Sequence, residues 1–215
     1  LGDQLWNGYQ DGWLALYGCV GLFALVHWSL TGERQYLVFA SVSLAMCLCL
    51  KNEGQLLLVA ALIPFLFGAR QHWKQWRTRD LLIGLSFMPF ILWALRKPYL
   101  PVGEGLEGSG LISRALITLF DWPELMHRLS VLVHDAATDT FLLETVAAFT
   151  IIALCTGLTK HTALIGISAL VYIAGLTAVY LGSPYDFDFH VTTSIDRVSL
   201  FPTLLLLIAI IDMMP

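Results

Sequence analysis

The sequence predicts an all-α membrane protein, a polytopic bundle of about seven transmembrane helices with short interfacial helices. Of its 215 residues, 57% are hydrophobic and only 13% are charged, and the mean hydropathy is +0.73. A soluble domain of this length carries about twice as much charge. The apolar residues also fall into separate stretches, and a helix needs about 20 of them to cross a bilayer.

Seven apolar stretches are separated by polar turns, and we expect each to be a helix: Gly12–Leu30, Tyr36–Leu50, Gln55–Ala69, Leu81–Leu95, Thr140–Leu158, Ala163–Leu181 and Val198–Ile211. Several are shorter than a typical crossing, so they are expected to extend into their flanks, to tilt or to thin the bilayer locally. Pro64 and Pro89 lie inside two of them. Such prolines are tolerated because neighbouring helices satisfy the carbonyls that they free.

A long polar region, residues 96–139, separates the fourth stretch from the fifth and is expected to form an external loop. Within it, Leu111–Phe120 and Glu124–His134 show apolar residues at helical spacing. Two interpretations remain open for this pair. The helices either lie at the membrane surface or pack on the bundle as ordinary loop helices.

The distribution of charge predicts the orientation. Lys and Arg divide evenly between the two sides, and the dense basic run 70–79 in a short loop breaks the tie, which places that loop in the cytoplasm. Several polar segments then converge on the external side: Asp3, Asp11, Lys51, Glu53, residues 96–139 and residues 183–197. We expect any functional site at this surface.

Other features restrict the class of protein. The net charge is only −4 and no basic tract indicates nucleic-acid binding, so nucleic acid is not an expected partner. The cysteines lie inside apolar stretches, where packed small side chains are commoner than disulfides or metal ligands: Cys19, Cys47, Cys49 and Cys155. The chain begins with Leu1 and lacks a signal-peptide pattern. We therefore expect a single transmembrane domain, residues 1–215, cut from a longer protein.

Two short motifs flank predicted helices on the external side. In Asn7–Gly12, the acid Asp11 either stabilises the start of a helix or acts as a base or ligand at the mouth of the bundle. In Leu50–Gly54, a tight turn holds Lys51 and Glu53 at the interface. The alternatives are a solvated turn and a functional pair. We predict catalytic roles for Asp11 and Glu53, and substrate binding by Lys51.

A third cluster, residues 183–197, crowds many polar residue types between two apolar stretches. Arg197 enters the final helix, where a guanidinium can hold a phosphate through two hydrogen bonds. His190 is a candidate metal ligand, proton donor or phosphate contact. The alternative is a surface pair of Asp196 with Arg197, whose side chain would extend to the membrane surface. We predict phosphate binding by His190 and Arg197.

The order of these motifs resembles that of polytopic bacterial glycosyltransferases of the C-type membrane fold, which are related to protein mannosyltransferases and aminoarabinose transferases. Gly8–Asp11 is similar to the Gly-Tyr-x-Asp motif that precedes a helix in that family. Leu50–Gly54 is similar to its Thr/Leu-Lys-x-Glu-Gly turn, and His190–Arg197 is similar to a segment before the last helix of bacterial members. The resemblance extends over most of the chain.

The resemblance implies transfer of a sugar from a lipid-phosphate carrier to an acceptor on the external side of the bacterial cytoplasmic membrane. Asp11 matches a family acid that assists this reaction, sometimes through a divalent metal, so such a metal is an expected cofactor. The expected partners are a polyprenyl-phosphate sugar donor and membrane lipids. The family's first-loop acid has no counterpart here, so we expect it upstream of Leu1 and expect the fragment alone to be inactive.

Two other classes of function remain as alternatives. A fragment of a transporter or flippase would carry polar groups near the middle of its spans. A non-catalytic membrane scaffold would need no convergence of acid, base and histidine at one surface. The predicted gathering of charges at one membrane face favours an enzyme at the interface.

Overall fold

The computed structural model describes residues 10–50, 54–75, 91, 111–138, 141–183 and 187–214. Every regular element in these ranges is helical, which confirms the predicted class for the described part. The elements are α2 (Asp11–Thr31), α3 (Arg34–Leu50), α4 (Gly54–His72), the 3-10 helix η1 (Trp73–Gln75), α6 (Leu111–Phe120), α7 (Trp122–Thr138), α8 (Leu142–Thr156), α9 (Lys160–Leu181), α10 (Phe187–Val198) and α11 (Leu200–Met213).

Four helices of the described part are long and apolar enough to cross a bilayer: α2, α4, α9 and the continuous pair α10–α11, which runs 27 residues. The shorter apolar helix α3 accompanies them. A fifth crossing results only if α7 and α8 count as one span, and they are bent by 82°. The helices are thus compatible with an integral membrane protein, but the predicted number of seven spans is not confirmed.

Two predicted segments differ from the structure. The stretch Thr140–Leu158 contains only the 15-residue helix α8, about 22 Å long, which is too short to cross a hydrocarbon core of about 30 Å unless the bilayer thins around it. The polar segment 183–197 is largely the helix α10, because its apolar residues recur every fourth position and pack inward: Phe187, Val191 and Ile195. The predicted crossing Leu81–Leu95 lies outside the described residues.

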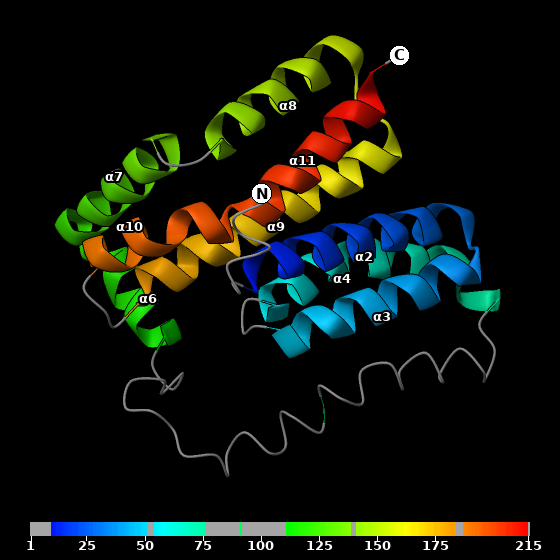
Figure 1. The fold of residues 1–215 in the computed structure, drawn as a ribbon, viewed down its shortest axis with the longest axis horizontal. Coiled ribbons are helices and arrows are strands. Elements are labelled where there is room, and N and C mark those ends of the chain that lie inside the picture. Colours follow the sequence, from blue (N-terminus) through cyan, green and yellow to red (C-terminus); the bar gives the residue numbers. More distant parts are fainter. Residues whose placement is uncertain are drawn as a thin grey trace.

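The main core surrounds α2, which contacts α3, α4, α9 and α11 (Figure 1). Glycines allow this close approach. A Cβ atom added at Gly18 would collide with Leu57 of α4 and with Phe201 of α11, and one at Gly21 would lie 3.1 Å from Leu44 of α3. In lipid, helices associate through such close packing, since there is no hydrophobic force between them. We call α2, α3, α4, α8, α9 and α11 the bundle.

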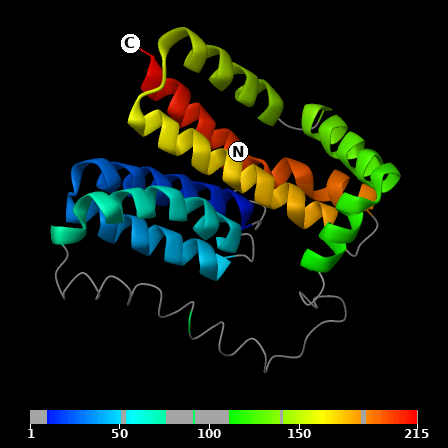
Figure 2. The same cartoon turned by 180° about the vertical axis from the view of Figure 1, so that it is seen from behind.

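A second, smaller core lies at one end of the molecule. Figures 1 and 2 show α6, α7 and α10 gathered there around the C-terminal end of α9, away from the C-terminus of the chain. We call these elements the cap. Its apolar residues come from α7, α9 and α10: Leu132, Ala136, Tyr180, Phe187, Val191 and Ile195.

The opposite end of the bundle is closed by turns and histidine contacts. Gly32 ends α2 with a φ of 75°, and its N–H donates to the Trp28 carbonyl at 2.8 Å. A side chain here would be strained, and its Cβ would lie 2.9 Å from Nδ1 of His72. At the same end His161 of α9 meets Asp212 of α11 at 2.9 Å. α4 ends near this end of the bundle.

Candidate functional site

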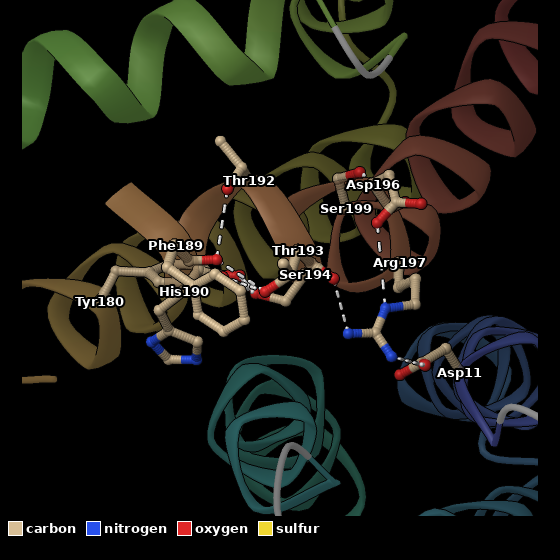
Figure 3. A network of polar contacts seen from close by, with 10 residues as sticks. All are labelled: Asp11, Tyr180, Phe189, His190, Thr192, Thr193, Ser194, Asp196, Arg197 and Ser199. Carbon is tan, nitrogen blue, oxygen red and sulfur yellow. Dashed lines mark hydrogen bonds and ion pairs between the residues drawn. The ribbon is translucent and has the colours of Figure 1, made fainter. Parts of the chain in front are cut away.

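The candidate site lies where the bundle meets the cap, and Asp11 and Arg197 are at its centre. Asp11 is the first residue of α2 and is buried, with 3% of its surface exposed. Arg197 lies in the last turn of α10. Their side chains approach to 3.9 Å between Nη1 of Arg197 and Oδ2 of Asp11 (Figure 3). The structure therefore brings together two predicted site residues from distant parts of the sequence.

The helix ends favour both charges. A helix carries partial positive charge at its N-terminus and partial negative charge at its C-terminus, so Asp11 at the start of α2 and Arg197 at the end of α10 each have the stabilising sign. Asp11 is not the N-cap residue, which is Gln10. The simple capping interpretation of Asp11 therefore does not describe the contact, although its interaction with the helix dipole remains.

The guanidinium of Arg197 lies between two carboxylates. Its Nη2 donates to the Thr193 carbonyl at 2.7 Å, and its Nε lies 3.9 Å from Oδ1 of Asp196. Both carboxylates are thus within ion-pair distance of the guanidinium. A phosphate held by Arg197 would lie beside Asp11 and Asp196 and would need further positive charge nearby.

His190 is held in a separate set of contacts on the same helix. Its Nδ1 lies 2.8 Å from the Ser183 hydroxyl, and its ring packs 5.1 Å from that of Tyr180. Ser194 donates to the His190 carbonyl at 2.6 Å, so the Tyr180 hydroxyl, 2.8 Å from Ser194, is the donor in that pair. These contacts fix the ring. His190 precedes Arg197 by seven residues, about 10 Å along the helix axis, so a ligand that touches both must reach that far.

The predicted residues Lys51 and Glu53 lie outside the described residues. Their described neighbours in sequence lie at the same end of the bundle as Asp11. The backbone of Gly54 abuts the Cys47 carbonyl closely enough that a Cβ atom would collide with it. Cys47 in turn contacts the Leu14 carbonyl at 3.7 Å, one turn into α2. Close packing against α3 therefore explains why a glycine stands at position 54, independently of any role of Lys51 and Glu53.

The expected divalent metal finds no ligand set in the described part of the chain, where no group of three or more His, Cys, Asp or Glu side chains is placed to hold a metal ion. The carboxylates of Asp11 and Asp196 have the guanidinium of Arg197 between them. That fixed positive charge disfavours a cation at the same place. The metal therefore stays a prediction that the described side chains do not support.

Sequence reasoning missed the residues that hold the cap on α9. The last carbonyls of a helix have no partner within the helix. Here Arg114 donates to the Gly182 carbonyl at 2.9 Å, and Arg128 and Thr118 donate to the Leu181 carbonyl at 3.1 and 3.2 Å. In the sequence, both arginines are only basic residues of amphipathic helices. The sequence predicts that the last carbonyls of α9 need hydrogen-bond donors, but it does not show which side chains supply them.

Comparison with known proteins adds no relative: no protein-family model, no curated protein and no solved structure matches this chain.

Proposed function

We propose that this chain takes part in moving a sugar from a lipid-phosphate carrier to an acceptor, at the external face of a bacterial cytoplasmic membrane. One observation carries the proposal. The contact of Asp11 with Arg197 joins the motif before the first helix to the motif before the last one, in a partly buried site at one end of apolar helices. These motifs are the ones that resemble C-type glycosyltransferases.

The chemistry needs a base and a cationic environment. The acceptor hydroxyl loses its proton as it attacks the anomeric carbon of the sugar, and the bond from that carbon to the phosphate oxygen breaks. Asp11 takes the proton or orients the acceptor, with Glu53 as a second acid. Arg197, Lys51 and His190 stabilise the negative charge of the departing polyprenyl phosphate. No step of this proposal uses a metal.

The position of the site suits a donor with a lipid tail. A polyprenyl chain partitions into the hydrocarbon core, whereas its phosphate stays near the membrane surface. The bundle helix α2, which begins at Asp11, and the bundle helix α11, which begins shortly after Arg197, are apolar along most of their length, and Asp11 and Arg197 lie at the same end of them. A phosphate at this level would therefore meet the site without leaving the membrane.

A transporter receives less support from the described spans. It would place charged or strongly polar groups near mid-span. The buried polar residues in the middle of the described spans are uncharged, and those of α9 are Ser168 and Tyr172. The buried carboxylates among the described residues are Asp11, at the end of α2, and Asp135, in the cap.

A non-catalytic scaffold is favoured by one specific observation. The contact of Asp11 with Arg197 also ties α2 to the α10–α11 helix. A buried charge left without its partner costs several kcal/mol. Such a contact can therefore serve stability alone. The experiment for the proposed function must therefore separate loss of activity from loss of stability.

The test is sugar transfer by the intact protein in lipid vesicles, with radiolabelled polyprenyl-phosphate mannose, glucose and aminoarabinose as donors. We expect Asp11→Asn to lower the transfer rate at least about 100-fold, because a positioned acid or base contributes about that much or more. Arg197→Lys keeps the charge but loses the planar fork, and it should also lower the rate. Asp188→Asn, on the exposed side of α10 beside His127, is the matched control and should transfer at the wild-type rate.

Thermal unfolding of the same purified variants separates the two interpretations. For an enzyme, Asp11→Asn loses transfer even at temperatures where it remains fully folded. Wild-type activity in both Asp11→Asn and Arg197→Lys would remove the proposal. A loss of activity that disappears when the variants are assayed well below their lowered melting temperatures would leave the contact of Asp11 with Arg197 a structural role only.

A further inference from the structure

Helix α6 turns large apolar side chains away from the protein and two polar side chains toward it. The residues that it turns toward the protein include Arg114 and Thr118, whose side chains donate to carbonyls at the end of α9. Apart from Ser113, the described residues that it turns outward are large and apolar, and this apolar surface continues to Trp122, the first residue of α7. We call this surface the α6 edge: Leu116, Ile117, Leu119, Phe120 and Trp122.

The α6 edge is strongly exposed. Phe120 has 88% of its surface accessible, Ile117 69% and Trp122 68%. Part of the edge surrounds a shallow hollow of about 700 Å³, whose lining is mainly apolar and includes Asp121 and Pro123 at the turn. In water, a helix on a protein surface turns its polar residues outward and its apolar residues inward. α6 does the opposite, which fits a surrounding medium that is apolar.

The position of α6 identifies that medium. The helix is bonded to the C-terminal end of α9, a candidate span of 22 residues, which is about 33 Å long. A span of that length crosses the hydrocarbon core of about 30 Å, so its end lies near one membrane surface. Since α6 is bonded to this end, it lies near the same surface.

We propose that the α6 edge is a membrane-interface anchor, embedded among lipid headgroups and the first methylenes of their acyl chains. Helices of this kind bury their apolar face about 5–10 Å into that boundary. Trp122 at the edge matches the preference of tryptophan for the interface. Arg114 is turned inward, where it donates to the Gly182 carbonyl. The inference does not depend on sugar transfer.

The test measures what surrounds spin labels on the intact protein in phospholipid vesicles. The exposed native cysteines Cys49 and Cys155 are first replaced by serine. Single cysteines are then introduced by Ile117→Cys and Phe120→Cys and labelled with a nitroxide. The matched control is Thr192→Cys in the same cap, an exposed position one turn from Asp188 and from Asp196 on α10. Collisions with oxygen, which concentrates in lipid, are compared with collisions with a water-soluble nickel complex.

We expect labels at residues 117 and 120 to show a ratio of oxygen to nickel collisions severalfold above that at residue 192. Circular dichroism of each labelled variant checks that the helices are retained, and the two edge positions serve as independent tests. Labels at both positions that collide mainly with the nickel complex would show an edge in water. Labels protected from both reagents would show an edge covered by protein. Either result overturns the anchor.

Discussion

The bundle and the cap are held together by different forces. In the bundle, α2 contacts its neighbours through glycines and fully buried apolar side chains, such as Gly18 against Leu57 and Phe201. The cap has a small apolar core, and charged contacts add to it: Arg128 is bonded to Glu124 at 2.6 Å and to the Leu181 carbonyl at 3.1 Å. Its guanidinium also lies 4.9 Å from the centre of the Phe187 ring.

The difference follows from the surroundings of each region. Within lipid, burial of apolar surface brings no gain between helices, so close packing of small residues decides which faces meet. At the end of a span, the last carbonyls need donors, and charge-assisted hydrogen bonds supply them most strongly. Each region therefore uses the interaction that its medium leaves available.

The candidate site lies on the boundary between the two regions. Asp11 begins a bundle helix, and Arg197 lies where α10 of the cap leads into α11 of the bundle. Any change in how the cap sits on the bundle would alter this contact. The substitutions below test whether the two regions respond differently, beginning with the largest expected effect.

Replacing Gly18 in the bundle should have the largest effect on stability. The Gly18→Leu side chain would occupy space taken by Leu57 and Phe201, and overpacking of a tight core costs about 1–3 kcal/mol and sometimes more. We expect at least the upper end of this range, measured as a lowered melting temperature in detergent. Ala147→Leu, at an exposed position of α8, is the matched control and should melt like the wild type. An unchanged melting temperature for Gly18→Leu would refute the close packing of α2.

Removing a charge from the cap should have a smaller and more local effect. Arg128 has only 16% of its side chain exposed, and a hydrogen bond to a charged group is worth about 1.5–3 kcal/mol. Arg128→Met should therefore speed amide hydrogen exchange in α10 and α6 while the exchange of α2 stays as in the wild type. Lys160→Met, at the exposed start of α9, is the control. Faster exchange throughout the bundle would contradict a cap that opens separately.

Most of the helices could be predicted from the sequence because their apolar stretches are long. The predicted stretch Gly12–Leu30 is observed as Asp11–Thr31, and Ala163–Leu181 as Lys160–Leu181. The loop helix predicted at Leu111–Phe120 is observed with those bounds. The errors lie where apolar character and polar residues mix. Residues 183–197 contain so many polar residues that the apolar stripe of α10 is not apparent without its partner α7.

The candidate site could be predicted only in part. The convergence of Asp11 and Arg197 followed from counting alternate sides of the membrane, and the structure brings their side chains together. Counting spans predicts at which end of the bundle a residue lies, but not which side chains it contacts. It therefore could not find Ser183 and Tyr180, which fix the His190 ring, because these contacts depend on how α9 and α10 pack. The assigned roles in catalysis remain predictions.

The smallest effect is expected at the far end of the bundle, where His161 and Asp212 join α9 to α11 at 2.9 Å. The Asp212 side chain is 39% exposed, and pairs of exposed charges contribute about 0–1 kcal/mol. Asp212→Ala, His161→Ala and the double variant form a cycle of thermal unfolding measurements from which the coupling energy follows. We expect a coupling below about 1 kcal/mol. A value of about 2 kcal/mol or more would mean that this end of the bundle, like the cap, depends on polar contacts for its stability. The difference in stabilising forces would then lie between the interior of the bundle and both of its ends, and not between the bundle and the cap.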